Sequence, residues 1–163
     1  MVNKEILLEV DDDVREAARA LVRTCSFGSL ATLAPNGGHP QCTRVGYATF
    51  EDGTPFVFIS ALAAHTGALM ADPRCSLLVG EPGKGDPLAH PRISITCDAE
   101  LIATNAPEAM RARELYLTSH PKARLYIDLP DFRFFRLGLK SASLNRGFGR
   151  AYALGPADLV LHN

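Results

Sequence analysis

Residues 58–80 carry the clearest potential for chemistry, because a strand-like apolar run there passes into a short helix. The run ends in Ser60, and a helix is expected to open near Ala63 with His65 and Thr66 in its first turn. Free backbone N–H groups and the helix dipole both favour an anion at such a helix start. A hydroxyl delivered by the preceding strand adds a further donor. This segment therefore predicts an anion site, with phosphate as the natural ligand.

Two arginine-bearing segments could add positive charge to that site. Arg44 lies in an otherwise mild strand, where a guanidinium needs an anionic partner or open water, and its planar fork suits a phosphate. Residues 146–150 read Arg-Gly-Phe-Gly-Arg, and the glycines permit close backbone approach. Phe148 could cover a ring, and Arg146 could meet a phosphate or a carboxylate. On the residues alone, a solvated Arg44 and a bulged strand at 146–150 stay open as alternatives.

The elements that must position these residues are short strands joined by turns, with few helices. A strong turn signal stands at Pro35-Asn36-Gly37-Gly38. The pattern predicts a mainly β protein with flanking helices, built on a closed or partly closed antiparallel barrel. The expected strands are 27–34, 40–50, 55–60, 75–80, 91–103, 132–137 and 142–152. The expected helices are 11–24, a helix from about 63 that ends at Asp72-Pro73, and 106–119, with a further turn at 122–127.

Composition narrows the classes of protein to consider. A length of 163 residues fits a single domain, 1–163, and the net charge of −1 gives no support for nucleic acid or membrane as partners. Residues 1–10 do not read as a secretory signal, so a cytoplasmic location is expected. The four cysteines form no Cys-x-x-Cys pair, and we expect small buried thiols and no metal site.

Four segments resemble one family, and they occur in its order along the chain. The chain resembles the pyridoxamine 5'-phosphate oxidase-like FMN-binding split barrels, and is closest to the branch that includes haem-utilisation proteins. The matching segments are Thr43–Tyr47, the Ser60…His65-Thr66…Asp72-Pro73-Arg74…Ser76-Leu77-Leu78 pattern, Gly85–Ala89 and Asn145–Ala151. The resemblance implies an antiparallel split barrel and a homodimer with FMN at the subunit interface.

The same resemblance assigns roles to individual residues. Arg44 would hold the flavin phosphate with the hydroxyls of Ser60 and Thr66 and backbone N–H groups from Ala64 to Thr66, His65 included. The backbone at Ile59 would run along the flavin ring. The partner would contribute the 85–88 loop, Arg92, Arg146 and Phe148. The 81–91 loop could equally be an ordinary surface connection. No protein nucleophile is expected, because the flavin carries the electron chemistry.

Departures from the vitamin-B6 oxidase pattern shape the functional expectation. Those enzymes have an Arg-Lys pair where this chain has His65-Thr66, a lysine at Thr49, and an arginine at His120. This chain also lacks tryptophan. On the residues alone, Tyr116, His120 and Arg124 are expected to lie on a solvated helix face, with Tyr116 half-buried. In the vitamin-B6 oxidase the matching region supplies a tyrosine, an arginine and a serine to the substrate phosphate, and here only Tyr116 matches. An FMN-dependent oxidoreductase that is not an efficient pyridoxamine-phosphate oxidase is therefore the first expectation.

Two alternatives stay open. One is a haem-binding or haem-degrading protein. Relatives of that kind carry an additional C-terminal domain with a haem-ligating histidine, for which this chain offers only His162 in its tail. The other is a flavin-carrying sensor module without turnover. The substrate, the electron donor and the electron acceptor are not encoded in any motif that the sequence presents.

Overall fold

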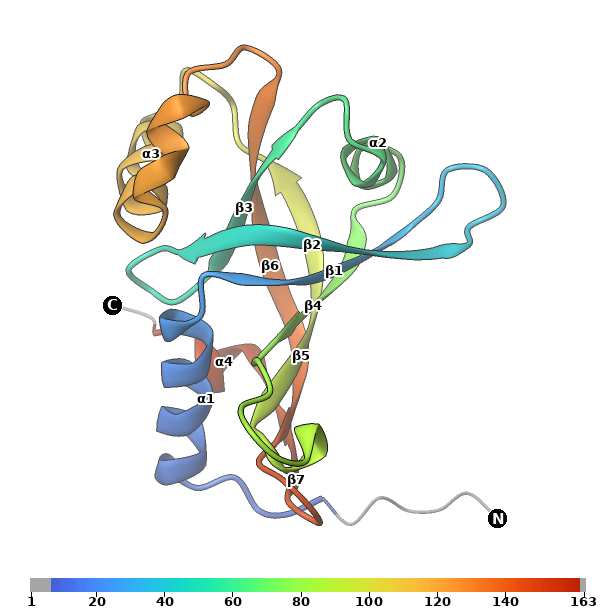
Figure 1. Cartoon of the computed structure of the whole chain (residues 1–163), viewed down its shortest axis with the longest axis vertical. Coiled ribbons are helices and arrows are strands. Elements are labelled where there is room, and N and C mark those ends of the chain that lie inside the picture. The colour runs from blue at the N-terminus through green and yellow to red at the C-terminus, as the bar shows by residue number, and fades with distance from the viewer. Residues whose placement is uncertain (1–6, 162–163) are drawn as a thin grey trace.

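The fold, taken from a computed structural model that describes residues 7–161, is an antiparallel barrel with helices around it (Figure 1). The sheet order is β3-β2-β1-β4-β5-β6-β7, and β3 also pairs with β6, so that strands β1 to β6 close on themselves. The barrel predicted from the turn and strand pattern is confirmed. The strands are β1 Phe27–Leu33, β2 Pro40–Thr49, β3 Pro55–Ser60, β4 Arg74–Val79, β5 Arg92–Leu101, β6 Phe132–Asn145 and β7 Ala151–Leu154.

Strand β6 closes the barrel and differs from expectation. The sequence predicted two strands, 132–137 and 142–152, but β6 runs unbroken from Phe132 to Asn145. Its first part pairs with β3, its last part pairs with β7, and β5 accompanies it along its length. A register shift at Thr96/Cys97 lets the long strand bend without a break. The stretch 138–141, which begins with Gly138, therefore continues the sheet instead of separating two strands.

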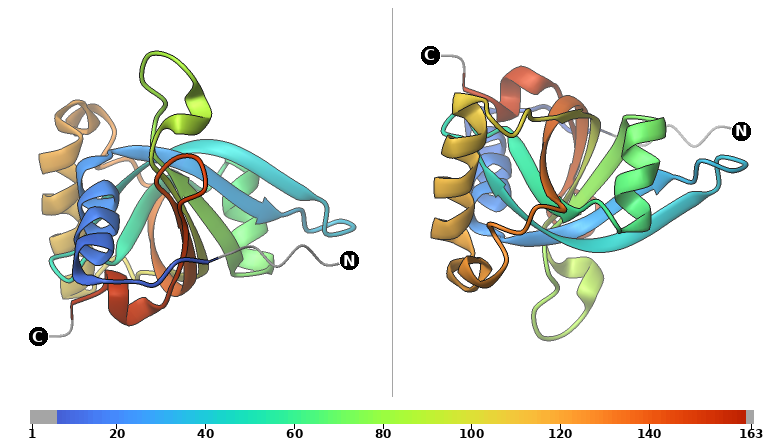
Figure 2. Two further views of the ribbon diagram at one scale, coloured as in Figure 1. Left: turned by 90° about the horizontal axis from the view of Figure 1, so that it is seen from below. Right: turned by 90° about the horizontal axis from the view of Figure 1, so that it is seen from above.

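The helices cover the barrel at separate places (Figure 2). Helix α1, Asp12–Thr24, is capped by Asp11, whose carboxylate accepts from the Val14 N–H at 2.9 Å, and it buries the predicted apolar face. Helix α2 ends before Asp72-Pro73, as predicted. The expected turn at 122–127 is a 3₁₀ segment, η2, over Pro121–Leu125. The remaining elements are α2 Ala64–Ala71, the 3₁₀ turn η1 Pro87–Ala89, α3 Pro107–Ser119 and α4 Pro156–Leu159.

Two apolar clusters hold these layers together. The larger fills the barrel and includes the inner face of α1, with Leu30, Leu77, Ile95 and Leu137 fully buried. The smaller is rich in aromatic residues and joins the outer face of β3 to α3 and η2 through Phe56, Phe58 and Tyr116, among others. Strand β3 is thus buried on both faces. This second cluster forms the floor beneath the candidate site.

The four cysteines differ in how deeply they are buried. Cys75 and Cys97 are buried as expected, but Cys25 is half-buried and Cys42 is exposed on β2, so the prediction of four buried thiols is wrong for these two. Within residues 7–161 no group of three or more His, Cys, Asp or Glu side chains could hold a metal ion. None of the helices there is long and apolar enough to cross a membrane. His162 and most of the 1–10 segment lie outside the described residues.

Candidate functional site

A groove of about 320 Å³ collects four of the predicted site residues from three elements. Arg44 comes from β2, Ile59 and Ser60 from the end of β3, and His65 from the first turn of α2. The local strand–helix pattern joined Ser60 and His65, the resemblance added Ile59 and Arg44, and the closed barrel brings all four side by side. The remaining lining is mostly apolar or aromatic: Val45, Gly46, Phe58, Ala63, Tyr116, Tyr126 and Phe132.

Arg44 provides the positive charge of this groove. Its side chain is exposed, its guanidinium carbon lies 5.6 Å from the centre of the Phe27 ring, and it forms no ion pair within residues 7–161. A second hollow, lined by Ser29 and Gly80 among others, adjoins it on the β1 side. Arg44 is therefore a cation between two hollows, available to an anionic ligand.

The hydroxyls of the predicted cradle are engaged within the chain. Thr66 is 4 % exposed and its hydroxyl donates to the Ser60 carbonyl oxygen at 2.6 Å. The Ser60 hydroxyl donates to Asp131 Oδ2 at 2.8 Å and accepts from the Leu62 N–H at 3.2 Å. Thr66 thus fixes the strand–helix junction instead of facing the groove. Asp131, which no sequence pattern singled out, places a carboxylate beside Ser60.

The start of α2 retains anion-binding character. Ala63 occupies the N-cap position and gives no side-chain cap, so the helix start carries no capping carboxylate or hydroxyl. The Thr66 N–H is already bonded to the Ala63 carbonyl oxygen at 3.0 Å. Of the three backbone N–H groups expected to face a ligand, at residues 64–66, those of Ala64 and His65 therefore remain.

His65 is held by a residue that sequence analysis did not assign. Its Nδ1 lies 3.1 Å from Thr43 Oγ1 on β2, which fixes the ring against the strand. Burial lowers the pKa of His65, so the imidazole is biased toward its neutral form. The groove then gains a polar ring without a second full positive charge.

The aromatic wall of the groove depends on close packing at Gly46. A Cβ at this position would lie 2.7 Å from Tyr116 Oη and 3.2 Å from His120 Cε1. Tyr116 stacks on His120 with ring centres 4.3 Å apart, and His120 Nε2 lies 2.8 Å from the Tyr47 carbonyl oxygen. Tyr116 is 3 % exposed, so the expected solvated face with a half-buried tyrosine is wrong. Burial, with the neighbouring Tyr126 phenol, raises the pKa of Tyr116.

The remaining predicted residues lie outside this groove, at the start of β5 and in the turn before β7, toward the bottom of Figure 1. Arg92 donates to the carbonyl oxygens of Leu88 and His90 at 3.0 and 3.2 Å, and so pins the 81–91 loop. Arg146 pairs with Asp13 of α1 at 2.8 Å. The 146–150 segment is the β6–β7 turn and not a bulged strand, with positive φ at Gly147 and Gly149. Phe148 is 69 % exposed.

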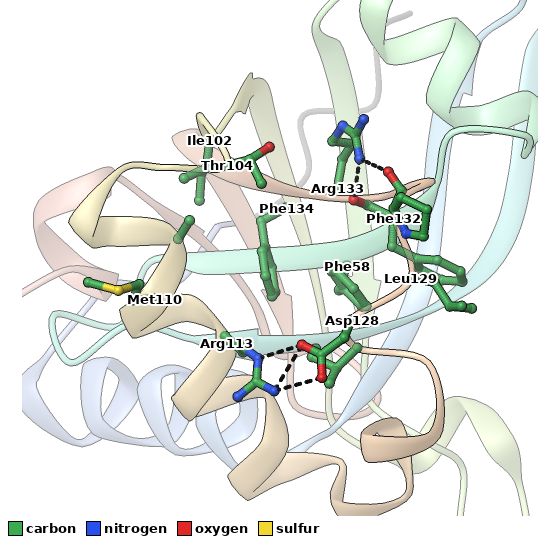
Figure 3. A pocket seen from close by; sticks show the side chains of 13 residues that line it. Phe58, Ile102, Thr104, Met110, Arg113, Asp128, Leu129, Phe132, Arg133 and Phe134 are labelled. Carbon is green, nitrogen blue, oxygen red and sulfur yellow. Dashed lines mark hydrogen bonds and ion pairs between the residues drawn. The ribbon is translucent and has the colours of Figure 1, made fainter.

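A further cavity of about 280 Å³ lies on the other side of Phe58 and Phe132, which line both spaces (Figure 3). It is enclosed by α3, the segment after β5 and residues 127–134. Arg113 points at Asp128 across its mouth, and Arg113 Nη2 lies 3.0 and 3.1 Å from the two carboxylate oxygens. This cavity thus combines an apolar floor with two arginines, Arg113 paired with Asp128 and Arg133 bonded to the Pro130 and Phe132 carbonyl oxygens.

Fold and site together define an antiparallel split β-barrel with an arginine-bearing, aromatic-walled groove at a strand–helix junction. The family description "Pyridoxamine 5'-phosphate oxidase" matches residues 14–144, and the chain belongs to this family. The family recognised from four short segments is thereby confirmed, and the match runs from the first turn of α1 almost to the end of β6.

Similar proteins support the haem-utilisation branch within this family. The chain is 31 % identical over 138 residues to "Non-canonical heme oxygenase HOZ, chloroplastic" of Arabidopsis thaliana, which covers 84 % of this chain and 41 % of that protein. The "heme binding protein from Mycobacterium smegmatis" is 29 % identical with a TM-score of 0.81, over 93 % of this chain and 61 % of that one. Another solved structure is 41 % identical with a TM-score of 0.87, over 95 % of this chain and 100 % of its own. The chain thus spans less than two thirds of the length of both haem-related proteins.

Proposed function

We propose that this protein binds FMN in the Arg44 groove and acts as an oxidoreductase. The observation that carries the proposal is the placement of Arg44, without an ion pair in residues 7–161, in one groove with the uncapped start of α2. A guanidinium and a helix N-terminus together form a typical phosphate site. The aromatic wall beyond them suits a planar ring.

The donors present fit a phosphate in position, with fewer hydroxyls than the resemblance implies. Thr66 is committed to the Ser60 carbonyl oxygen, and Ser60 must turn from Asp131 to reach a ligand. Arg44 and the Ala64 and His65 N–H groups would hold the phosphate. We therefore expect moderate affinity, dominated by Arg44.

Each part of the groove has a task in this proposal. FMN, when bound, would supply a ring that accepts and donates electrons. The Ile59 backbone, at the edge of β3, would offer main-chain groups to that ring. Tyr116 and Phe132 would limit water on one side. His65, biased to its neutral form, would offer a hydrogen-bonding ring nitrogen beside the phosphate without repelling Arg44.

A homodimer with the flavin at the subunit interface completes the proposal. The groove is open, and a cofactor site usually buries most of its ligand. A second copy could supply the missing wall with its 85–88 loop, Arg92, Arg146 and Phe148. A cytoplasmic location stays a prediction from sequence; the Arabidopsis relative is described as chloroplastic.

Haem is the second candidate ligand, and His65 gives it a specific basis. Its Nδ1 contacts Thr43 while burial favours the neutral imidazole, and a neutral imidazole with its other nitrogen oriented by a partner is the form that ligates metals. Arg44 could then pair with a haem carboxylate. The names of two similar proteins point to the same cofactor.

One set of titrations separates these candidates. The cofactor-free chain is titrated with FMN and, separately, with haemin, and each is followed by absorption and by quenching of fluorescence. FMN binding should retain the flavin bands at roughly 370 and 450 nm. Arg44→Ala should weaken FMN affinity roughly 10- to 100-fold, the effect of losing one charged hydrogen bond.

Control variants show whether a change in affinity comes from the Arg44 groove. Arg74→Ala removes an exposed strand arginine paired with Asp72, outside the groove, and should leave affinity unchanged. His65→Gln should abolish a Soret shift with haemin if haem is the ligand, and should weaken FMN only slightly. Unchanged FMN affinity in a folded Arg44→Ala variant would place the phosphate elsewhere.

A further inference from the structure

Three small polar side chains form one row across the inside of the barrel. Cys75 on β4 and Cys97 on β5 are direct Cα partners. On the other side of β4, the β1–β4 register places Thr32 next to Cys75, one step beyond the Ala31–Ser76 pair. Thr32, Cys75 and Cys97 are 2 %, 8 % and 1 % exposed. Residues opposite one another in antiparallel strands share a face, so all three point into the barrel.

The ladder holds the two cysteines at a separation that a disulfide can span. The Ala99 N–H donates to the Pro73 carbonyl oxygen at 2.8 Å, which makes this pair a hydrogen-bonded position of the β4–β5 ladder. Hydrogen-bonded positions alternate, so the Cys75–Cys97 pair two residues further on is also one. Such pairs have Cα atoms about 5.5 Å apart, within the roughly 4.4–6.8 Å found across disulfides.

The two thiols already interact, and their environments differ. The neighbouring Cys97 thiol lowers the pKa of Cys75, whereas the Cys75 thiol and burial raise the pKa of Cys97. The Cys97 thiol also lies 3.6 Å from the Ile95 carbonyl oxygen. Cys75, the more exposed of the two, is the thiol that ionises first. A thiolate is the form that attacks oxidants.

A cavity of about 280 Å³ gives Cys75 contact with the exterior at this end of the barrel. Its lining includes Thr32, Cys75, Ser76 and the exposed Arg74. Thr32 Oγ1 is fully buried and has no hydrogen-bond partner within the described residues. An unpaired buried hydroxyl is costly and rare in folded proteins. Thr32 and Cys75 both line this cavity, so a small polar molecule that reached the Thr32 hydroxyl would lie close to Cys75.

We propose that Cys75 and Cys97 are a redox-active pair, which a small hydroperoxide admitted beside Thr32 oxidises to a disulfide. With hydrogen peroxide, the Cys75 thiolate attacks one oxygen, the O–O bond breaks, and the departing oxygen leaves as water after protonation. Cys97 then attacks the resulting sulfenic sulfur, the S–S bond forms, and a second water leaves. Two thiols lose two electrons and two protons, and one peroxide becomes two waters. A dithiol reverses the change.

Thiol counting and peptide mapping test the proposal on the full chain. After limited hydrogen peroxide, unfolded protein should show two free thiols instead of the four cysteines of the untreated chain. Its mass should fall by two hydrogen atoms, a digest should contain the 75–97 link, and dithiothreitol should restore all four thiols. Four remaining thiols, or a link through Cys25 or Cys42, would overturn the assignment. The parent chain alone decides this point, whatever the variants do.

Variants then separate the steps. Cys42→Ser removes the exposed thiol and should still form the link. Cys97→Ser should stop at a sulfenic acid on Cys75, which dimedone traps. Thr32→Val, similar in shape, should slow oxidation by peroxide roughly 2- to 10-fold, the worth of one hydrogen bond, while oxidation by diamide keeps its rate. An equal effect on both oxidants would remove Thr32 from the peroxide step.

Discussion

At the scale of single residues, the groove depends on the absence of a side chain at Gly46. Gly46→Ala would set a Cβ 2.7 Å from Tyr116 Oη, and Tyr116 is buried in the aromatic cluster. We expect a loss of about 1–3 kcal/mol in the free energy of unfolding, as for other overpacked sites, together with weaker FMN binding. Urea unfolding and FMN titration measure the two effects.

The matched control is another glycine of the same region. Gly67 lies in α2, and a Cβ there meets nothing within 4 Å. Gly67→Ala should raise the free energy of unfolding by roughly 0.5–1 kcal/mol, because alanine favours the helix. Equal stability of the two variants would mean that Tyr116 moves aside freely.

His65 gives the groove a dependence on pH with a definite sign. Burial lowers the pKa of this histidine below its ordinary value of 6.5, so the unfolded chain binds a proton more readily than the folded one. The contribution of His65 to stability is therefore complete above pH 6.5 and is lost as the pH falls toward the folded pKa. His65→Gln should flatten this part of the profile of unfolding free energy against pH. A variant profile as steep as that of the parent would assign the slope to other groups.

Residue types predicted which side chains gather in one groove better than which hydrogen-bond donors there are free. Ser60, His65 and Arg44 were recognised as anion-compatible and do share one groove. The sequence did not predict that Thr66 turns inward. It also could not predict the bond from Ser60 to Asp131, because Asp131 lies 71 positions away along the chain. Contacts of this kind depend on barrel closure and leave no local pattern.

At the scale of elements, the sequence predicted the ends of helices well where neighbouring residues determine them. Helix α1 follows its aspartate-rich start and its apolar spacing, and α2 stops before Asp72-Pro73. Strand β6 was predicted as two strands, 132–137 and 142–152, with the 138–141 stretch between them. In the fold this stretch pairs with β5 across a register shift, and β5 supplies the continuity that the β6 sequence lacks. Tertiary pairing commonly overrides strand propensity in this way.

The cap of α1 provides a test at this scale. Asp11→Ala removes the acceptor of the Val14 N–H, and we expect a loss of about 1 kcal/mol in the free energy of unfolding. Asp12→Ala is the control, because its bond to Arg15 is fully exposed and such pairs contribute about 0–1 kcal/mol. Urea unfolding of both variants measures the difference. If Asp12→Ala cost as much as Asp11→Ala, the dipole and not the cap would hold the helix start.

At the scale of the whole molecule, the predicted cofactor residues form two groups, and the Arg44 groove holds one of them. Arg44, Ser60 and His65 lie where β2, β3 and α2 meet, whereas Arg146 and Phe148 lie at the β6–β7 turn. A single copy therefore leaves the two groups apart. In a two-fold homodimer, the Arg44 groove of each copy could face the β6–β7 turn of its partner, which would generate two equivalent sites.

The surface near η1 has the character that such a pairing needs. Leu88 is 56 % exposed and Phe148 is 69 % exposed. Their segments are in contact, because a Cβ at Gly147 would lie 3.0 Å from the Ala89 carbonyl oxygen. Arg92 holds the same loop in place through the Leu88 carbonyl oxygen. Two large, exposed apolar side chains on a surface that hydrogen bonds hold in place are suited to contact with a partner subunit.

We expect a homodimer from this arrangement. Light scattering at low micromolar concentration should give twice the 17.6 kDa chain mass, with an interface above roughly 2,000 Å² as in obligate dimers. Phe148→Asp should shift the chain toward monomer and weaken FMN binding together, because a charge would be buried without a partner and the wall of the site would be lost. Leu125→Asp, at an 88 % exposed position on η2, should change neither property. A Phe148→Asp monomer that held FMN as tightly as the parent would contradict the shared site, since one copy would then enclose the cofactor alone.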